Sequence, residues 1–199
     1  MAFNINLFAG ALKLGGARTS LFQVNITNPA NGAADIQVPF LARAAQIPAA
    51  TIAPLDVPYF GRQLRLAGNR TFADWTATII NDEDMQIRNA MEEWSNTING
   101  FQTNLRKFGA SSPALYKSTA QVTQFSKTGT PVRVYNFVGI FPTEVSAIEM
   151  DWGTDAVSEF TVTFTYDYWE VSGGITGLSL IHISEPTRPE RISFSGICF

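Results

Sequence analysis

Residues 160–168 alternate large apolar side chains with shorter polar ones at every step, and this pattern limits the fold more than any other feature of the chain. One face carries Phe160, Val162, Phe164, Tyr166 and Tyr168, and the other carries Thr161, Thr163, Thr165 and Asp167. A strict two-residue period is typical of an antiparallel strand with one buried face and one face in water. The chain therefore needs a sheet whose apolar face is covered by a core.

Other segments also favour strands. The two-residue period returns in residues 145–152, where Ser146, Ile148, Met150 and Trp152 oppose Ala147, Glu149 and Asp151. It also runs through residues 72–80, where Ala73, Trp75, Ala77 and Ile79 oppose Asp74, Thr76 and Thr78. Residues 20–26, 63–66, 120–125 and 132–140 have compositions that suit strands. These patterns predict a mainly β fold with antiparallel strands.

One helix is expected between the strands. Asn81 or Asp82 can cap its N-terminus, and Gly100 provides a stop. Glu83 and Asp84 then fall in the first turn, where carboxylates are favoured. One face of this helix carries Ile87, Met91, Trp94 and Ile98. This spacing favours packing of the helix onto a sheet over binding of a cofactor.

Residues 47–60 form an apolar segment with three prolines, Pro48, Pro54 and Pro58. Because proline donates no backbone hydrogen bond, the segment is not expected in the centre of a sheet, and we expect it to cross the surface in an extended form. An exposed apolar segment of this length needs a partner. The candidate contact residues are Ile52, Pro54, Leu55, Pro58 and Tyr59.

Composition excludes several classes of function. The 199 residues are 45% hydrophobic with a net charge of −3, which suits one packed domain and gives no basic field for reading nucleic acid. A single cysteine allows neither an internal disulfide nor a cysteine zinc site. No apolar run is long enough for a membrane helix, and the N-terminus lacks the basic start of a secretory signal. Catalytic motifs are also absent, so we predict no enzyme, no metal and no cofactor.

The last 22 residues, 178–199, are interpreted separately. The string LSLIHISEPTR at residues 178–188 resembles the translation of a transposase sequencing adapter, and the rest resembles read-through of that adapter. The tail holds His182 and Cys198, which are the only histidine and cysteine of the chain. We therefore predict one domain over residues 1–177, which lacks the common general base and the thiol nucleophile.

Charge is one-sided near the end of this domain. Residues 134–177 contain no lysine or arginine and seven acids, namely Glu144, Glu149, Asp151, Asp155, Glu159, Asp167 and Glu170. Such a segment gives a negative potential to the surface on which it lies.

Five strings, taken in order, resemble the T4-type tail tube proteins of contractile-tailed bacteriophages. They are GGARTSLFQV (15–24), VPYFGRQLRLAGNRTFADWTATIINDED (57–84), MEEWSNTING (91–100), IFPTEVSAIEMDW (140–152) and FTVTFTYDYWE (160–170). The combination of an R-T-F-x-x-W strand, an N-D-E turn, a helix and a late D-Y-W-E spans nearly the whole domain.

The resemblance implies an antiparallel β-sandwich or small barrel with one flanking helix, in a subunit that forms six-membered rings. The rings would stack into a tube, because head-to-tail contacts polymerise without limit. It implies the sheath, baseplate and tape-measure proteins as partners, and DNA that passes through the bore without adhering. The expected location is the virion tail, and the host cytoplasm before assembly. An extended arm before Gly61, contacting a neighbouring subunit or ring, also follows from it.

A bore that carries DNA favours carboxylates and hydroxyls over cations, because phosphate contacts would retard sliding. The candidates for the bore are Glu149, Asp151, Thr161, Thr163, Thr165 and Asp167.

Three alternatives stay open. The chain could be the tube protein of a related contractile injection system, including type VI secretion, and would then differ in cargo. It could instead be a monomeric β-sandwich binding module, which would form no tubes. The third alternative is an enzyme, which would need a cleft of convergent polar groups.

Overall fold

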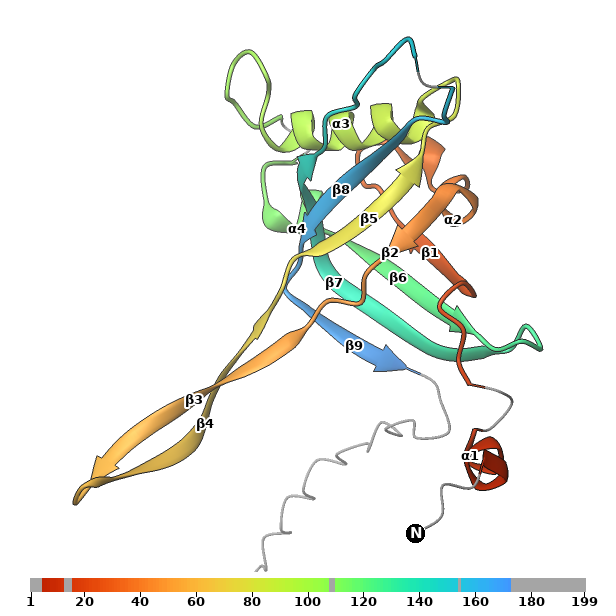
Figure 1. The fold of residues 1–199 in the computed structure, drawn as a ribbon. Coiled ribbons are helices and arrows are strands. Elements are labelled where there is room, and N and C mark those ends of the chain that lie inside the picture. The colour runs from red at the N-terminus through yellow and green to blue at the C-terminus, as the bar shows by residue number, and fades with distance from the viewer. Residues whose placement is uncertain (1–4, 13–15, 108–109, 154, 173–199) are drawn as a thin grey trace, which may run out of the picture.

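The computed structural model describes residues 5–12, 16–107, 110–153 and 155–172, and its centre is a curled antiparallel sheet (Figure 1). The strands of this sheet are β1 (Phe22–Ile26), β2 (Ala42–Ala45), β5 (Trp75–Ile80), β6 (Ser118–Phe125), β7 (Pro131–Val145), β8 (Glu159–Thr165) and β9 (Tyr168–Ser172). Their order is β1-β6-β7-β8-β5-β2, with β9 also paired to β7. The sheet curls until its edge strands β1 and β2 come near each other, which confirms the expected mainly β class.

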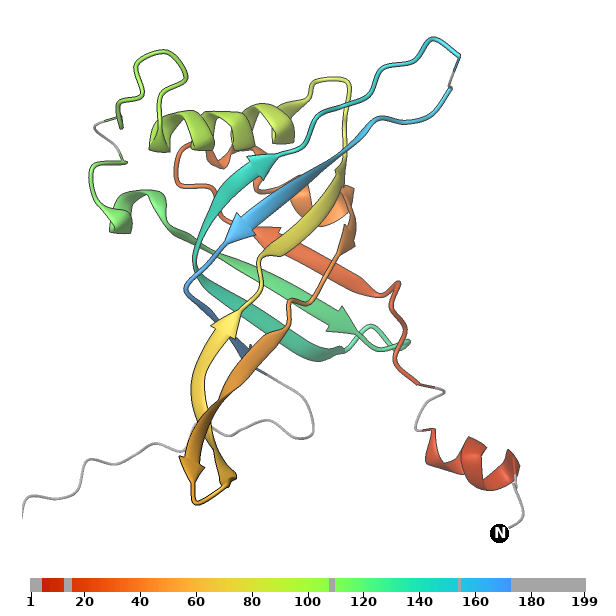
Figure 2. The ribbon, with the colours of Figure 1, turned by 60° about the vertical axis from the view of Figure 1, so that its left-hand side comes forward.

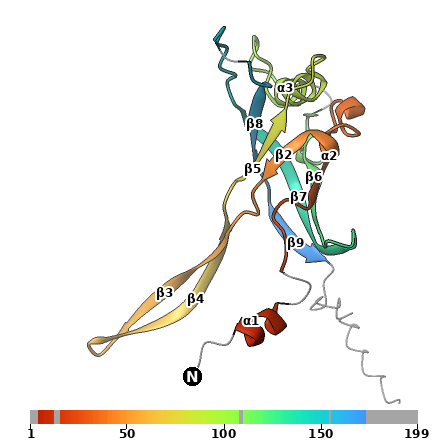
Figure 3. The same cartoon turned by 45° about the vertical axis from the view of Figure 1, so that its right-hand side comes forward.

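Two further strands leave the body as an arm. Strand β3 (Ala50–Tyr59) pairs only with β4 (Arg62–Phe72), and Figures 1 and 3 show the hairpin projecting far from the sheet. The sequence suggested that residues 47–60 cross the surface, and this is wrong. Their backbone hydrogen bonds are instead satisfied by β4, the strand that follows them along the chain. Prolines are tolerated in β3 since both strands of a two-stranded ribbon are edges.

The long strand β7 joins the two halves of the sheet. Its N-terminal part pairs with β6 on one side and β9 on the other, and its C-terminal part pairs with β8. The pairing of β6 skips Gly139, which has a φ of +73°. Residues with this φ are almost always glycine, so the bulge lies at a position where the chain can bend at little steric cost.

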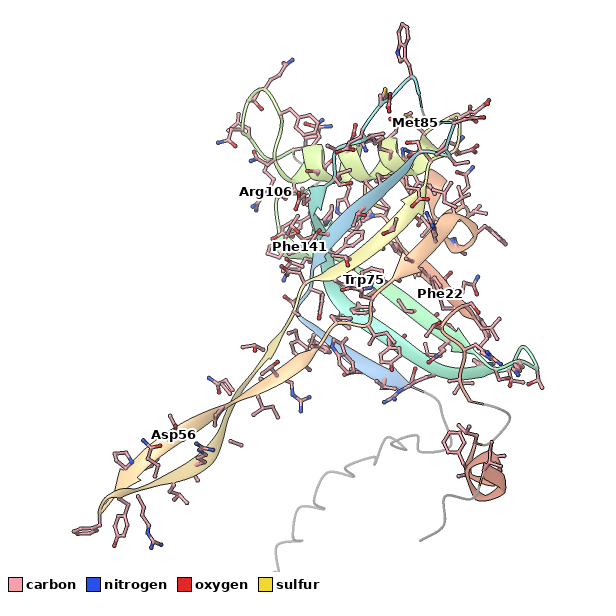
Figure 4. The ribbon with its side chains drawn as sticks, in the orientation of Figure 1. Phe22, Asp56, Trp75, Met85, Arg106 and Phe141 are labelled. Atoms are coloured by element: carbon pink, nitrogen blue, oxygen red, sulfur yellow. The ribbon has the colours of Figure 1, made fainter. Side chains whose placement is uncertain are left out.

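The core lies on one face of this sheet and is dominated by aromatic rings. Trp75 stacks on Phe137 and on Phe164, with ring centroids 4.8 and 5.2 Å apart. Each aromatic pair of this kind contributes about 1 kcal/mol beyond the area it buries. Figure 4 shows Trp75 within the body and Asp56 far out on the arm, and of the arm strands only Phe72, at the base of β4, packs against this core.

Helix α3 (Gln86–Ile98) covers one end of the core. Ile87, Met91 and Trp94 are buried and Ile98 is half-buried against them, which confirms the predicted apolar stripe. The predicted cap at Asn81 or Asp82 is wrong, because the Met85 amide bonds to the Asp82 carbonyl at 2.9 Å in a turn before the helix. Glu83 and Asp84 consequently precede the helix instead of occupying its first turn.

Short helices were not predicted from the sequence. They are α1 (Ile5–Ala11), α2 (Val38–Leu41), α4 (Pro113–Tyr116) and a 3-10 turn, Gly32–Ala34. Figure 2 shows α1 away from the sheet, whereas α2 and α3 lie against it. These helices are too short for a periodic pattern to predict them.

Three strand predictions were wrong in extent. Residues 146–152 are not a strand, since β7 ends at Val145 and its ladder with β8 continues only as one bond from the Ser146 amide to the Thr161 carbonyl at 2.9 Å. The alternation at 160–168 belongs to two strands, because Asp167 donates its amide proton to the Val138 carbonyl in a turn between them. Tyr168 therefore lies in β9 and is exposed, whereas the next residue, Trp169, points inward. Residues 72–80 are likewise divided, at Ala73 and Asp74.

Candidate assembly surfaces

The arm exposes apolar side chains along both of its strands. Its exposed large apolar residues are Ile52, Leu55, Val57, Tyr59, Phe60, Leu64 and Leu66. At its tip Phe60 and Gly61 have φ values of 41° and 77°, so the hairpin closes with a two-residue turn in which both residues have positive φ. Phe60 is 90% exposed in this costly conformation. An apolar hairpin of this kind is typical of a surface that is covered in an assembly.

The sequence prediction placed the contact residues on one strand only. Ile52, Leu55 and Tyr59 are exposed on β3, as are Pro54 and Pro58. The apolar residues of β4 were missed, although Leu64 and Leu66 alternate with polar neighbours in the printed sequence. The pairing of Asp56 with Arg65, at 3.5 Å across the arm, was also missed.

Two hydrogen bonds fix the base of the arm. Tyr166 donates its hydroxyl proton to the Ala73 carbonyl oxygen at 2.6 Å, and Thr165 donates to the Asp74 carboxylate at 3.0 Å. Ala73 and Asp74 are the two residues between β4 and β5. The β8–β9 junction therefore sets the direction in which the arm leaves the sheet.

Burial at this junction changes the pKa of one side chain, Tyr166. Burial raises the pKa of Tyr166 to about 12, and the negative charge of Asp74 acts in the same direction. The phenol thus keeps the proton that it donates to Ala73 at all physiological pH values.

A second buried hydrogen-bond network holds α3 to the segment after β1. The Asn28 side chain donates to the Ala90 carbonyl at 2.9 Å and accepts from the Ala30 amide at 2.9 Å. The backbone amide of Asn28 donates to the Asp35 carboxylate at 3.1 Å. Burial raises the pKa of Asp35, and the bond from Asn28 opposes that shift.

The structure does not bring the six candidate bore residues together. Thr161, Thr163 and Thr165 alternate with buried residues along β8, so they lie on the sheet face opposite the core. Glu149 and Asp151 lie instead in the irregular segment after β7, where Trp152 is fully exposed. The strand predicted over residues 145–152 is therefore wrong for Glu149 and Asp151, because β7 ends at Val145.

Asp167 is engaged in an ion pair. Lys117 donates to both of its carboxylate oxygens, at 2.6 and 2.9 Å. The carboxylate lies against Gly139, in the space that a Cβ at that position would occupy. Asp167 therefore closes the β7 bulge, and its charge is balanced by a cation that the sequence pattern did not reveal.

Metal ligands and membrane-spanning helices were also sought in the described part of the chain. Within those residues no group of three or more His, Cys, Asp or Glu side chains could hold a metal ion. No helix among them is long and apolar enough to cross a bilayer. The predicted adapter tail, residues 178–199, lies outside the described residues.

Sequence comparison relates this chain to phage proteins. The model of the family described as "Phage tail tube protein" matches residues 8–172. The tail tube protein gp19 of Enterobacteria phage T4 is 33% identical over 156 residues, which cover 77% of this chain and 91% of that protein. The tail tube protein of Serratia phage KSP90 is 27% identical over 168 residues, 81% of this chain and 93% of the relative.

Solved structures show the same fold. The sheath–tube complex of an extracellular contractile injection system contains a chain with a TM-score of 0.58 and 11% identity, over 86% of this chain and 99% of that one. The tube-terminating cap of the anti-feeding prophage contains a chain with a TM-score of 0.59 and 16% identity, over 79% and 91%. At such identities the likeness extends to the fold alone, whereas the phage relatives and the family match cover most of the sequence. The chain therefore belongs to the phage tail tube protein family, whose members are structural proteins and not enzymes.

Proposed function

We propose that this protein is the tube subunit of a contractile phage tail and assembles as six-membered rings that stack end to end. The observation that supports this proposal most is the exposed apolar arm. A monomer gains nothing by keeping seven large apolar side chains in water at the end of a two-stranded ribbon. In a stack, the same ribbon is covered by the neighbouring subunit or ring.

The arm and the rest of the subunit suit a head-to-tail contact. The arm projects from one end of the sheet, and α3 lies across the other end (Figure 1). A surface at one end that binds a different surface of the next copy makes a heterologous contact, which extends without limit. Tail length must then be set by another protein, for which the tape-measure protein is the expected partner. The sheath and baseplate proteins are the expected partners outside and at the end of the tube.

The bore would conduct DNA during ejection. Of the residues expected there, Thr161, Thr163 and Thr165 are the ones with structural support, since they lie on one strand and face away from the core. Glu149, Asp151 and Asp167 are left out of the proposed bore surface, because Glu149 and Asp151 lie beyond the end of β7 and Asp167 is paired with Lys117.

Similarity favours a phage tail over the tube of another injection system. The phage relatives are up to 33% identical, whereas the injection-system chains are 11–16% identical. The proposed locations are accordingly the virion tail and, before assembly, the host cytoplasm.

Electron microscopy of the purified full chain tests the proposal. We expect hollow tubes with six-fold symmetry in cross-section and a regular axial repeat. A protein that sediments as a monomer at high concentration and forms neither rings nor tubes would support the binding-module alternative instead.

A further inference from the structure

The outer part of the arm is amphipathic, because its cross-strand pairs place the large apolar side chains on one face. Directly opposed residues of an antiparallel pair share a face, and so do residues two apart along one strand. The pairs on this face are Leu55 with Leu66, Val57 with Leu64, and Tyr59 with Arg62. Five exposed apolar side chains and one arginine therefore form a single surface, which we call the apolar face of the arm.

The two faces of the arm differ in how their charges are paired. On the polar face, Asp56 lies opposite Arg65 and forms an ion pair with it at 3.5 Å. On the apolar face, Arg62 has no ion-pair partner among the described residues. Covering an unpaired charge is costly. A surface that covers the apolar face must therefore accept apolar side chains and also supply an anion for Arg62.

An exposed surface lies at the far end of the two strands that hold the arm. Strand β5 begins close to the root of the arm and ends at Ile80. Residues 81–85 follow it and meet residues 146–158, which join β7 to β8. The Asn81 amide donates to the Ser158 carbonyl at 2.9 Å, and the Asn81 side chain donates to the Ser158 hydroxyl at 2.8 Å. Figure 1 shows both segments away from the arm. We call their described residues, 81–85, 146–153 and 155–158, the rim.

The rim combines exposed apolar side chains with acids. Its exposed large apolar residues are Met150, Trp152 and Val157, of which Trp152 is fully exposed. Its exposed acids are Asp82, Glu83, Asp84, Glu149, Asp151 and Asp155. Neither segment contains a lysine or an arginine. A tryptophan ring among carboxylates suits a partner that presents both apolar groups and arginine, since the ring face also attracts a guanidinium group.

We infer that the rim of one subunit receives the apolar face of the arm from a subunit of the next ring, with Arg62 placed among the rim carboxylates. The occupant is a second copy of this chain. The inference rests on the proposed function and extends it by naming the surface that receives the arm. The two surfaces are complementary in charge, and both expose apolar side chains. Because they lie at opposite ends of β5 and β8, each added ring presents a new free surface of the kind just used.

The same charges disfavour the wrong pairings. Two rims brought together would oppose acids to acids, and two arms brought together by their apolar faces would bring one Arg62 near the other. Like charges across an interface are costly, whereas opposite charges favour one partner and one orientation. The direction of stacking therefore follows from the arm and the rim alone.

Charge reversal on both surfaces tests the pairing. The arm variant is Arg62→Glu, the rim variant combines Glu149→Lys with Asp155→Lys, and a third protein carries all three changes. The control is Lys127→Glu, in the turn between β6 and β7. All four positions are exposed, so we expect unchanged melting temperatures. The measurement is the lowest protein concentration at which tubes pellet. We expect the arm variant and the rim variant each to raise it at least about tenfold. The combined protein should return toward the parent value, and the control should match the parent.

Cross-linking reports the contact directly, whatever the charge variants do to assembly. One protein carries Arg62→Cys and a second, tagged protein carries a cysteine in the rim, both in a Cys198→Ser background that removes the only natural cysteine. The rim variants are Glu83→Cys, Glu149→Cys and Asp155→Cys. Mixed tubes are treated with a short bismaleimide, and dimers of the two proteins are measured on a denaturing gel. We expect such dimers with at least one rim variant and none when Lys127→Cys replaces the rim variant.

The outcomes separate this inference from the proposed function. If the parent chain forms no tubes, the proposed function is wrong and the inference fails with it. If the parent forms tubes and the rim variant assembles equally well, the rim binds another partner, such as the sheath, and only this inference is overturned. It is also rejected if the combined protein assembles no better than the arm and rim variants, or if Arg62→Cys cross-links to no rim position.

Discussion

The Tyr166 hydroxyl donates a 2.6 Å hydrogen bond to the carbonyl oxygen of Ala73, and this contact joins the β8–β9 junction to the first residue after the arm. Both residues lie beside the aromatic core, where the Tyr166 ring contacts Phe72 and Phe137. A side chain of the body thus holds the root of the hairpin, where Phe72 at the end of β4 also packs against the core.

Replacing Tyr166 by Phe should weaken this root without unfolding the protein. The ring contacts remain, and one hydrogen bond is lost, so the free energy of unfolding should fall by about 1 kcal/mol. Urea denaturation measures this. Tyr168→Phe, an exposed control two residues later, should change stability far less, and equal losses in the two variants would contradict the assigned role.

The same tyrosine predicts a loss of stability in alkali. The pKa of Tyr166 is raised to about 12 in the folded protein, whereas an unfolded tyrosine titrates near 10. Between these values the unfolded chain releases a proton that the folded chain keeps, so stability is full below pH 10 and falls as pH rises toward 12. Thermal melts of the parent and Tyr166→Phe should converge over this window. Parallel pH profiles would exclude the predicted titration.

Gly139→Ala should be more harmful than Gly129→Ala. Both glycines have a φ between +70° and +80°, so both variants incur the same backbone strain. Only at Gly139 does the new methyl group meet the Asp167 carboxylate, whereas Gly129 has open space. We expect an additional loss of about 1–3 kcal/mol in the free energy of unfolding. Similar stabilities in the two variants would mean that Asp167 moves aside at no cost.

Asn28→Ala should destabilise the attachment of α3. It removes a buried amide, and the partners left in the interior lose their hydrogen bonds, which costs about 2 kcal/mol. Asn89→Ala, on the exposed face of the same helix, is the control and should change stability by less than about 0.5 kcal/mol. Chemical denaturation of the two variants side by side gives the comparison, and a neutral Asn28→Ala would show that water replaces the lost bonds.

Charges on the arm should block tubes while sparing the fold. Ile52→Glu and Leu55→Glu alter side chains that are 47% and 57% exposed, so we expect unchanged melting temperatures and no long tubes by microscopy. Leu115→Glu, on α4 with 50% exposure, is a control with the same change outside the arm. Normal tubes from both arm variants would remove the arm from the assembly contact.

Deletion of residues 178–199 should change neither thermal stability nor assembly, because the adapter-like string is not expected to belong to the fold. The truncated and full chains are compared by thermal melts and by microscopy. A clear loss of either property would mean that the tail is a genuine part of the protein.

The sequence by itself determined the fold class and the core-facing residues. Alternation identified the inward side of β8, and helical spacing identified Ile87, Met91 and Trp94, since burial imposes the period of each element on the chain. The tail tube resemblance came from short strings, and the family comparison confirms that resemblance over residues 8–172. Proline excluded residues 47–60 from the central sheet for the local reason that it lacks a donor.

Only the tertiary structure decided where strands end and which polar groups meet. Residues 145–152 alternate as well as a strand does, but strand formation needs a continuous ladder with a neighbour. The ladder of β7 with β8 ends at Val145, and at Ser146 the side-chain hydroxyl accepts the Thr161 amide proton in place of a backbone carbonyl. The ion pair of Lys117 with Asp167 joins residues 50 positions apart. Hydrogen bonds from the Gln121 side chain to Asn136 and from Asn136 to Ser172 join the three strands β6, β7 and β9. Such contacts depend on register between distant segments, which a local pattern does not encode.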